Sequence, residues 1–157
     1  MKEKNLVTKI RVYSYNELSD ADKKLIDLAK SATGRAYAPY SRFNVGAALL
    51  LANGEIVTGS NQENVAFPSG TCAERTTCFY AGATYPGVGF VKLAIAAFHN
   101  GAFTPSPVSP CGACRQVLAE YERLGGGKLE ILLYGDNEIY VLDEVSALLP
   151  LVFDEKL

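Results

Sequence analysis

Apolar residues along the chain recur in two patterns, one spaced as on a helix and the other continuous as in a buried strand. Between residues 19 and 34, leucine, isoleucine and alanine return every three to four positions, which predicts a helix capped by Ser19 and ended at Gly34. Two more helices are expected over Ala73–Ala83 and Gly112–Leu124. A short final helix is expected from Asp143 through Leu149.

Continuous apolar runs predict strands that are covered on both faces of a sheet, and Leu93–Phe98 is the clearest of them. The pair Asn53-Gly54 is a strong hairpin signal between two such strands. A hairpin followed by alternating strands and helices predicts an α/β fold, with helices on both faces of a mixed sheet. The predicted strands are Val45–Ala52, Glu55–Gly59, Val91–Phe98, Leu129–Tyr134 and Ile139–Leu142.

Length and composition favour one domain over residues 1–157, because 157 residues with 48% apolar content suit a single core. The net charge of −2 gives no overall electrostatic reason to bind a nucleic acid polymer or an anionic membrane. The longest apolar runs are too short to span a bilayer, and the polar N-terminus is followed by no secretory stretch. We therefore expect a cytoplasmic protein whose thiols stay reduced.

Three of the four cysteines stand at predicted helix starts, where unpaired N–H groups favour the thiolate that binds metals. Cys72 precedes one helix, and Cys111 and Cys114 open the next as Cys-x-x-Cys. Three protein ligands leave one position open, as in catalytic rather than structural zinc sites. Cys78 is expected in the core, and His99, the only histidine, in a loop.

Glu74 follows Cys72 by two residues, so its carboxylate could lie over the open metal position. There it could take a proton from bound water, whose pKa a zinc ion lowers to about 7. Cys-x-Glu followed by Pro-Cys-x-x-Cys matches the pattern of zinc nucleobase deaminases in their three-cysteine form. The alternatives are a thioredoxin-like redox pair or buried hydrophobes for the cysteines, and an ordinary first-turn acid for the glutamate.

Two arginines follow the ligand segments closely. Three thiolates on Zn²⁺ total −1, so we expect Arg75, Arg115 or both to hydrogen-bond the sulfurs and offset that charge. The alternative for both is a solvated helix surface.

Four segments in order carry a resemblance to a known family: Phe43–Ala48, Asn61–Asn64, Cys72–Thr76 and Pro110–Gln116. On these segments the sequence resembles the small homo-oligomeric cytidine deaminases, over about residues 25–153. The resemblance implies a three-layer α/β/α fold with a five-stranded mixed sheet. It also implies hydrolysis of cytidine and 2′-deoxycytidine to uridine and 2′-deoxyuridine plus ammonia, as in pyrimidine salvage.

The resemblance further implies a role for each matching residue. One zinc ion per chain would be held by the three cysteines, and Glu74 would shuttle protons. Asn61 and Glu63 would bind the ribose 3′-hydroxyl. Phe43 would pack against the pyrimidine, and Ala73 would offer backbone groups to the base. The family is usually a homotetramer, in which Phe153 matches an aromatic residue that reaches into a neighbouring subunit; the alternative is a local anchor.

This sequence departs from the family at two positions, where members often have Tyr in place of Phe67 and Ala in place of Val65. Two other functions stay open: a zinc deaminase of another aminopyrimidine such as blasticidin S, and a non-catalytic zinc-stabilised module with a fourth protein ligand. Mild acidity and the lack of a Lys/Arg cluster argue against a polynucleotide-editing deaminase.

Overall fold

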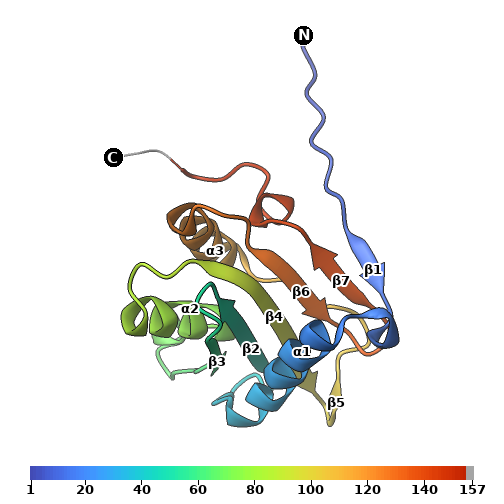
Figure 1. Cartoon of the computed structure of the whole chain (residues 1–157). Helices are drawn as coiled ribbons and strands as arrows, with labels where there is room; N and C mark the ends of the chain where they lie inside the picture. The colour runs from blue at the N-terminus through green and yellow to red at the C-terminus, as the bar shows by residue number, and fades with distance from the viewer. Residues whose placement is uncertain (155–157) are drawn as a thin grey trace.

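Helices cover both faces of one mixed sheet in the computed structural model, which describes residues 1–154 (Figure 1). The strands run in the order β1-β7-β6-β4-β2-β3, with β5 paired to the far end of β4. The β4–β6 pair is parallel and the other pairs are antiparallel. The strands are β1 (Arg11–Tyr13), β2 (Asn44–Leu51), β3 (Ile56–Ser60), β4 (Phe90–His99), β5 (Ala102–Phe103), β6 (Glu130–Tyr134) and β7 (Ile139–Leu142).

The predicted α/β/α class is confirmed, but the expected number of five strands is wrong for residues 1–154, which contain seven. The five expected strands are β2, β3, β4, β6 and β7. The additional β1 and β5 span only three and two residues, too short for a hydrophobic pattern to reveal. The sequence did contain a turn signal before β5, the pair Asn100-Gly101. In the structure both residues have the positive φ angles of a two-residue hairpin turn.

The three helices are α1 (Asp20–Ala32), α2 (Ala73–Thr84) and α3 (Gly112–Gly125). Ser19 caps α1 as predicted, accepting a hydrogen bond from the Asp22 N–H. This helix ends before the predicted Gly34 and passes into a 3₁₀ turn. The expected final helix is only the 3₁₀ turn Val145–Ala147. Among residues 1–154, no helix has the length and apolar composition needed to cross a membrane.

The sheet divides the core into two halves. Ala47 and Leu49 on β2 face α2 and α3, whereas Ala48 between them faces α1. Because strand side chains alternate between faces, a strand buried on both sides must be apolar throughout. The covered faces thus explain the continuous apolar runs in the sequence (Figure 1).

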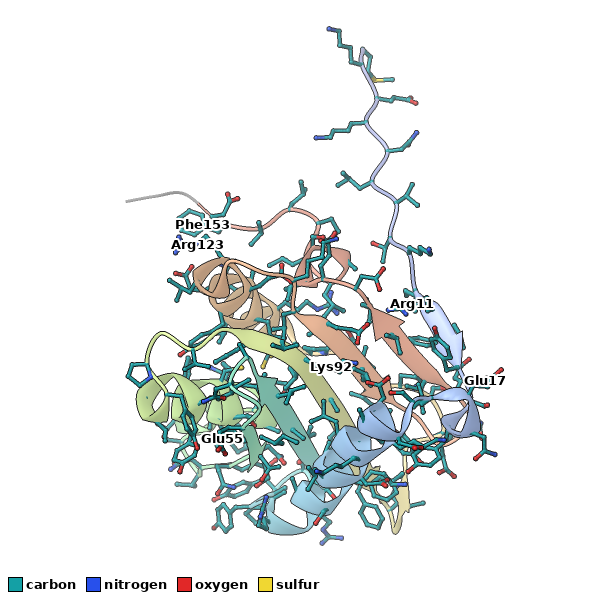
Figure 2. All side chains as sticks on the ribbon, in the orientation of Figure 1. Arg11, Glu17, Glu55, Lys92, Arg123 and Phe153 are labelled. Carbon is teal, nitrogen blue, oxygen red and sulfur yellow. The ribbon has the colours of Figure 1, made fainter. Side chains whose placement is uncertain are left out.

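Charged residues at one margin of the sheet tie α1 to the strands. Lys92 on β4 pairs with Asp22 of α1 and with Glu130 of β6. Arg11 on β1 pairs with Glu130 and with Asp143 after β7. Figure 2 shows Arg11 on the short outer strand and Lys92 farther inside the sheet. The network joins the N-terminal and C-terminal parts of the fold.

Candidate active site

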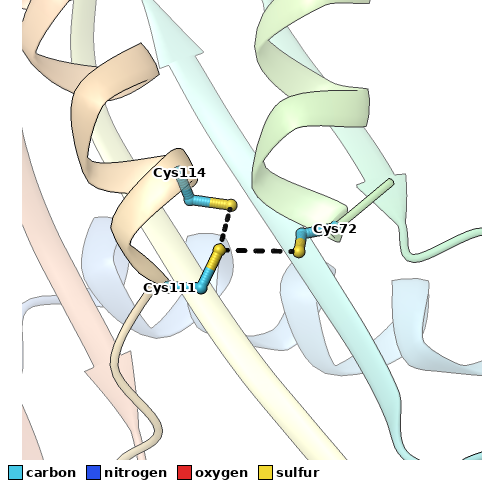
Figure 3. A group of neighbouring side chains, drawn as sticks. All are labelled: Cys72, Cys111 and Cys114. Atoms are coloured by element: carbon cyan, nitrogen blue, oxygen red, sulfur yellow. Dashed lines mark hydrogen bonds between the residues drawn. The ribbon is translucent and has the colours of Figure 1, made fainter. Parts of the chain in front are cut away.

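The first turns of α2 and α3 lie side by side and bring three sulfur atoms together (Figure 3). Cys72 and Cys111 are the N-cap residues of the two helices, and Cys114 follows in the first turn of α3. Neither N-cap thiol makes a capping hydrogen bond to the backbone of its own helix. Both sulfurs therefore turn toward the gap between the helices rather than back onto the backbone.

The spacing of these sulfurs fits one tetrahedral zinc ion. The Sγ atoms of Cys72 and Cys111 are 3.9 Å apart, and those of Cys111 and Cys114 are 3.5 Å apart. A tetrahedron with Zn–S bonds of about 2.3 Å has S–S edges of about 3.8 Å. All three sulfurs lie within 4.8 Å of one another, so the cysteines are positioned to hold a metal ion.

Hydrogen bonds favour the thiolate form of Cys72. The thiol of Cys114 and then the Arg75 guanidinium lower the pKa of Cys72 to about 5, against the opposing effect of burial. The pKa of Cys114 is raised, first by that same bond to Cys72 and then by burial. A negative charge is therefore favoured within the sulfur group, as a cation site requires.

Glu74 lies in the first turn of α2, and its side chain lines the same cavity as Cys72 and Cys111. Only 5% of its surface is exposed. Burial raises the pKa of this carboxyl group, and the neighbouring charge of Cys72 adds to the effect. The arrangement places a buried acid–base group beside the sulfurs.

The two arginines have different partners. Arg75 reaches back one helical turn and donates to Sγ of Cys72 at 3.9 Å. Arg115 donates instead to the carbonyl oxygens of Pro110 and Leu148, at 2.8 and 2.7 Å, and to Ser109. The guanidinium of Arg115 thus ties the loop before α3 to the C-terminal segment. Of the two arginines expected to hydrogen-bond the sulfurs, only Arg75 does so.

A cavity of about 690 Å³ opens in front of the sulfurs, large enough for a small organic molecule. It gathers residues from separate parts of the chain. Predicted residues that line it are Phe43, Asn61, Glu63, Cys72, Glu74, Arg75 and Cys111.

The segment after β3 forms one wall and is held on both sides by backbone hydrogen bonds. Its residue Gln62 pairs with Thr71, while the N–H of Glu63 donates to the Tyr37 carbonyl at 2.8 Å. Asn61 and Glu63 are two residues apart on this extended segment and both reach the cavity. The two side chains therefore share the side of the segment that faces the cavity.

The Asn61 amide also holds the start of β2. Its Nδ2 donates to the Phe43 carbonyl at 2.9 Å, and its Oδ1 accepts from the Val45 N–H at 2.8 Å. Since an amide has two donors and two acceptor lone pairs, one of each stays available for a further hydrogen bond. Asn61 therefore both fixes the strand that carries Phe43 and keeps hydrogen-bonding capacity for a ligand.

Four predicted residues stand outside the cavity lining; two of them, Cys114 and Arg115, are described above, and the others are Ala73 and Phe153. Ala73 is fully buried at the start of α2. Phe153 is 65% exposed and lies near Arg123 beside α3 (Figure 2). An exposed ring is not a local core anchor, so that alternative for Phe153 does not hold in this structure.

Sequence reasoning missed several cavity residues, most of them in loops. Tyr40 forms an edge-to-face aromatic pair at 5.6 Å on one wall with Phe67, which the sequence marked only as a departure from the family. A signal existed for the first of these loops, because Pro39-Tyr40-Ser41 ends one residue before the segment Phe43–Ala48 that carries the resemblance. Other missed lining residues are Ser41, Val45, Gln62, Asn64, Gly70, Thr71, Ile95, Val108 and Ser109.

Comparison with known proteins settles the family. The family model described as the cytidine and deoxycytidylate deaminase zinc-binding region matches residues 19–124, which include all three cysteines and Glu74. The chain belongs to this deaminase family. The match begins after β1, so that outer strand and the residues before it lie outside the family region.

Individual deaminases are similar over much of the chain. A cytidine deaminase of Sporosarcina psychrophila is 51% identical over 100 residues, which are 63% of this chain and 68% of that protein. A probable cytidine deaminase of Dictyostelium discoideum is 34% identical over 135 residues, 85% of this chain and 84% of that one. The crystal structure of cytidine deaminase from Burkholderia pseudomallei, 39% identical, superposes with a TM-score of 0.71 over 87% of this chain and all of the other.

Proposed function

We propose that this chain is a zinc-dependent deaminase that hydrolyses cytidine and 2′-deoxycytidine to uridine and 2′-deoxyuridine with release of ammonia. The observation that carries the proposal is the cluster of three sulfurs at tetrahedral spacing, two of which line the same cavity as the buried carboxyl group of Glu74. Among residues 1–154 the cluster offers three cysteine ligands, whereas a purely structural zinc site normally uses four protein ligands. Three ligands favour the catalytic interpretation over the structural module.

Cys72, Cys111 and Cys114 would hold the zinc ion. When bound, Zn²⁺ lowers the pKa of water from about 15.7 to about 7, which supplies a nucleophile at neutral pH. A carboxylate oxygen of Glu74 accepts the proton of the attacking water and delivers a proton to N3 of the base. The same carboxylate then takes the proton of the hydroxyl group newly bonded to C4 and passes it to the amino group at C4, so that C4 becomes a carbonyl and the C4–N bond breaks to release ammonia. Its burial excludes bulk water from these transfers.

The remaining cavity residues would hold the nucleoside. The Phe43 ring packs against the pyrimidine, and Ala73 offers backbone groups to the base. Asn61 and Glu63 bind the 3′-hydroxyl of the sugar; the carboxylate accepts a hydrogen bond from that hydroxyl. Their separation by one residue on an extended segment lets both side chains address one group.

We further propose a homotetramer of single-domain subunits in the cytoplasm. The exposed ring of Phe153 supports an assembly in which this residue reaches a neighbouring subunit. The four cysteines, all of them free in this structure, suit a reducing compartment.

Glu74→Gln tests the catalytic assignment, with Glu55→Gln in the exposed β2–β3 hairpin as a matched control. We expect Glu74→Gln to keep about one zinc per chain and to lose about 10²–10⁴-fold in kcat, because general acid–base catalysis supplies that much. Zinc is measured by elemental analysis and turnover by ammonia release from cytidine. Wild-type turnover in Glu74→Gln would refute the mechanism.

A comparison of substrates distinguishes a cytidine deaminase from a deaminase of another aminopyrimidine. Wild-type protein is assayed with cytidine, 2′-deoxycytidine and blasticidin S at equal concentrations. We expect the two nucleosides to be the preferred substrates, because Asn61 and Glu63 provide polar partners for a sugar hydroxyl. A clear preference for blasticidin S would assign the cavity to the other aminopyrimidine.

A further inference from the structure

One side chain joins two residues that the proposed function assigns to different parts of the nucleoside. The hydroxyl of Ser41 bonds both the Glu63 carboxylate and the backbone N–H of Phe43. Building on the proposed function, we propose that Ser41 is a positioning residue: it fixes the carboxylate that binds the sugar relative to the ring that contacts the base. Its effect on the substrate is exerted through the Glu63 carboxylate, which it holds in place relative to Phe43.

The direction of each hydrogen bond follows from chemistry. The Phe43 N–H can only donate, so the Ser41 oxygen accepts there at 3.0 Å. The single hydroxyl proton of Ser41 is then free to point at Oε1 of Glu63. One serine thus uses its donor on one substrate-binding residue and a lone pair on the other.

The Glu63 carboxylate is fixed by the same turn at its second oxygen. Oε2 accepts from the backbone N–H groups of Tyr40 at 2.9 Å and of Ser41 at 3.3 Å. These bonds lower the pKa of Glu63, the hydroxyl of Ser41 most strongly. A carboxylate has about four acceptor positions, and three are used here, so the ionised group keeps capacity for one external hydroxyl donor.

The turn itself needs such support. Arg42, between Ser41 and Phe43, has φ of 56°, a left-handed conformation that few residues other than glycine adopt readily. Its N–H donates to the Ala38 carbonyl at 2.9 Å, and its own carbonyl lies 3.0 Å from Nδ1 of His99. The His99 ring also packs on Phe43 with centroids 5.5 Å apart. The Ser41 hydroxyl completes this framework on the side that faces Glu63.

A substrate that lacks the 3′-hydroxyl distinguishes two roles of Ser41: positioning of the Glu63 carboxylate for that hydroxyl, and general support of the loop. Ser41→Ala, Ser41→Thr and the control Ser31→Ala on the exposed side of α1 are assayed with cytidine and 3′-deoxycytidine. With cytidine we expect Ser41→Ala to raise KM about tenfold and change kcat less than about threefold, as for a lost hydrogen bond to a charged group. With 3′-deoxycytidine we expect a KM change below about threefold.

Ser41→Thr keeps a hydroxyl and is expected to restore the KM for cytidine to within about threefold of wild type, while Ser31→Ala changes neither substrate. An equal rise of KM for both substrates would overturn the proposal and make Ser41 a structural turn residue. An unchanged KM for cytidine in Ser41→Ala would also overturn it. Failure of wild-type protein to deaminate cytidine would instead refute the proposed function on which the inference rests.

Discussion

The guanidinium of Arg75 lies 3.9 Å from the sulfur of Cys72, one turn back along α2. Three thiolates around a divalent cation leave a net charge of −1, and a cationic hydrogen-bond donor at one sulfur offsets part of it. We therefore predict that Arg75→Gln lowers zinc affinity and kcat by about tenfold each. Zinc affinity is measured by competition with a chelator, and kcat with saturating cytidine.

Arg123→Gln is the matched control, because Arg123 lies near the other end of α3 and pairs only with Glu120 within the described residues. It is expected to behave as wild type in both measurements. Wild-type zinc affinity and turnover in Arg75→Gln would remove this arginine from the metal site.

The central strands could be predicted because a strand that is buried on both faces of the sheet is apolar at every position, which shows in the sequence as a continuous apolar run. Leu93–Phe98 is such a run, and it forms the centre of β4. The outer strand β1 has no such apolar run, because its three residues pair only with β7 at the edge of the sheet. Similarly, nothing in the sequence distinguished the 3₁₀ turn Val145–Ala147 from the start of a helix.

The sulfur cluster could be predicted because its chemistry is local: Cys72 and Cys111 each cap a helix. The partners of Arg115 could not, because Leu148 lies 33 residues away in sequence and meets it only through the fold. Ser41 was missed for the same reason, since its contact with Glu63 spans 22 residues between two loops. Residue type identifies reactive groups, whereas tertiary contacts determine which groups hold them in place.

Gly46 on β2 allows α1 to approach the sheet closely. A Cβ at this position would lie 2.1 Å from the Ala29 carbonyl oxygen and 2.6 Å from the Thr33 nitrogen, both backbone atoms that cannot move independently. We predict that Gly46→Ala lowers the free energy of unfolding by about 3 kcal/mol, measured by urea denaturation. Gly34→Ala, where a Cβ meets open space, should stay within about 1 kcal/mol of wild type. Equal stability of the two variants would contradict this packing.

The pair of Lys92 and Asp22 should make stability depend on pH. Burial opposes the charge of Asp22, but hydrogen bonds from Lys92 and Ser19 outweigh it and lower the pKa of this carboxyl group. The resulting stabilisation is present above the unfolded pKa of about 4 and is lost as pH falls through the lower folded value. We predict that Lys92→Met destabilises by about 1–2 kcal/mol at pH 7 and by clearly less below pH 3.

Thermal unfolding across this pH range measures the effect. Lys128→Met is the control, because the Lys128–Glu144 pair is far more exposed, with 70% of the lysine side chain accessible, and its removal should cost less. A Lys92→Met penalty that stays constant from pH 7 to pH 2.5 would show that packing of the lysine stem, rather than its charge, is what matters.

Phe153 combines an anchored backbone with an exposed ring. The side-chain amide of Gln116 donates to the Phe153 carbonyl at 2.8 Å, and the Phe153 N–H lies 3.4 Å from the amide oxygen. Phe153 is 65% exposed as a residue, so removal of its ring should change the free energy of unfolding by less than about 0.5 kcal/mol. We nevertheless predict that Phe153→Ala weakens subunit association and lowers kcat/KM for cytidine about tenfold, because the ring would complete a neighbouring site.

Sedimentation velocity and kinetics at several protein concentrations measure these effects. Leu124→Ala, an equally exposed side chain in α3, is the control and should leave association and kcat/KM unchanged. If Phe153→Ala lost stability and activity together while the oligomeric state stayed the same, the ring would serve its own subunit. Loss of activity that is reversed by raising the protein concentration would instead show that the residue acts between subunits, because only an association equilibrium depends on concentration.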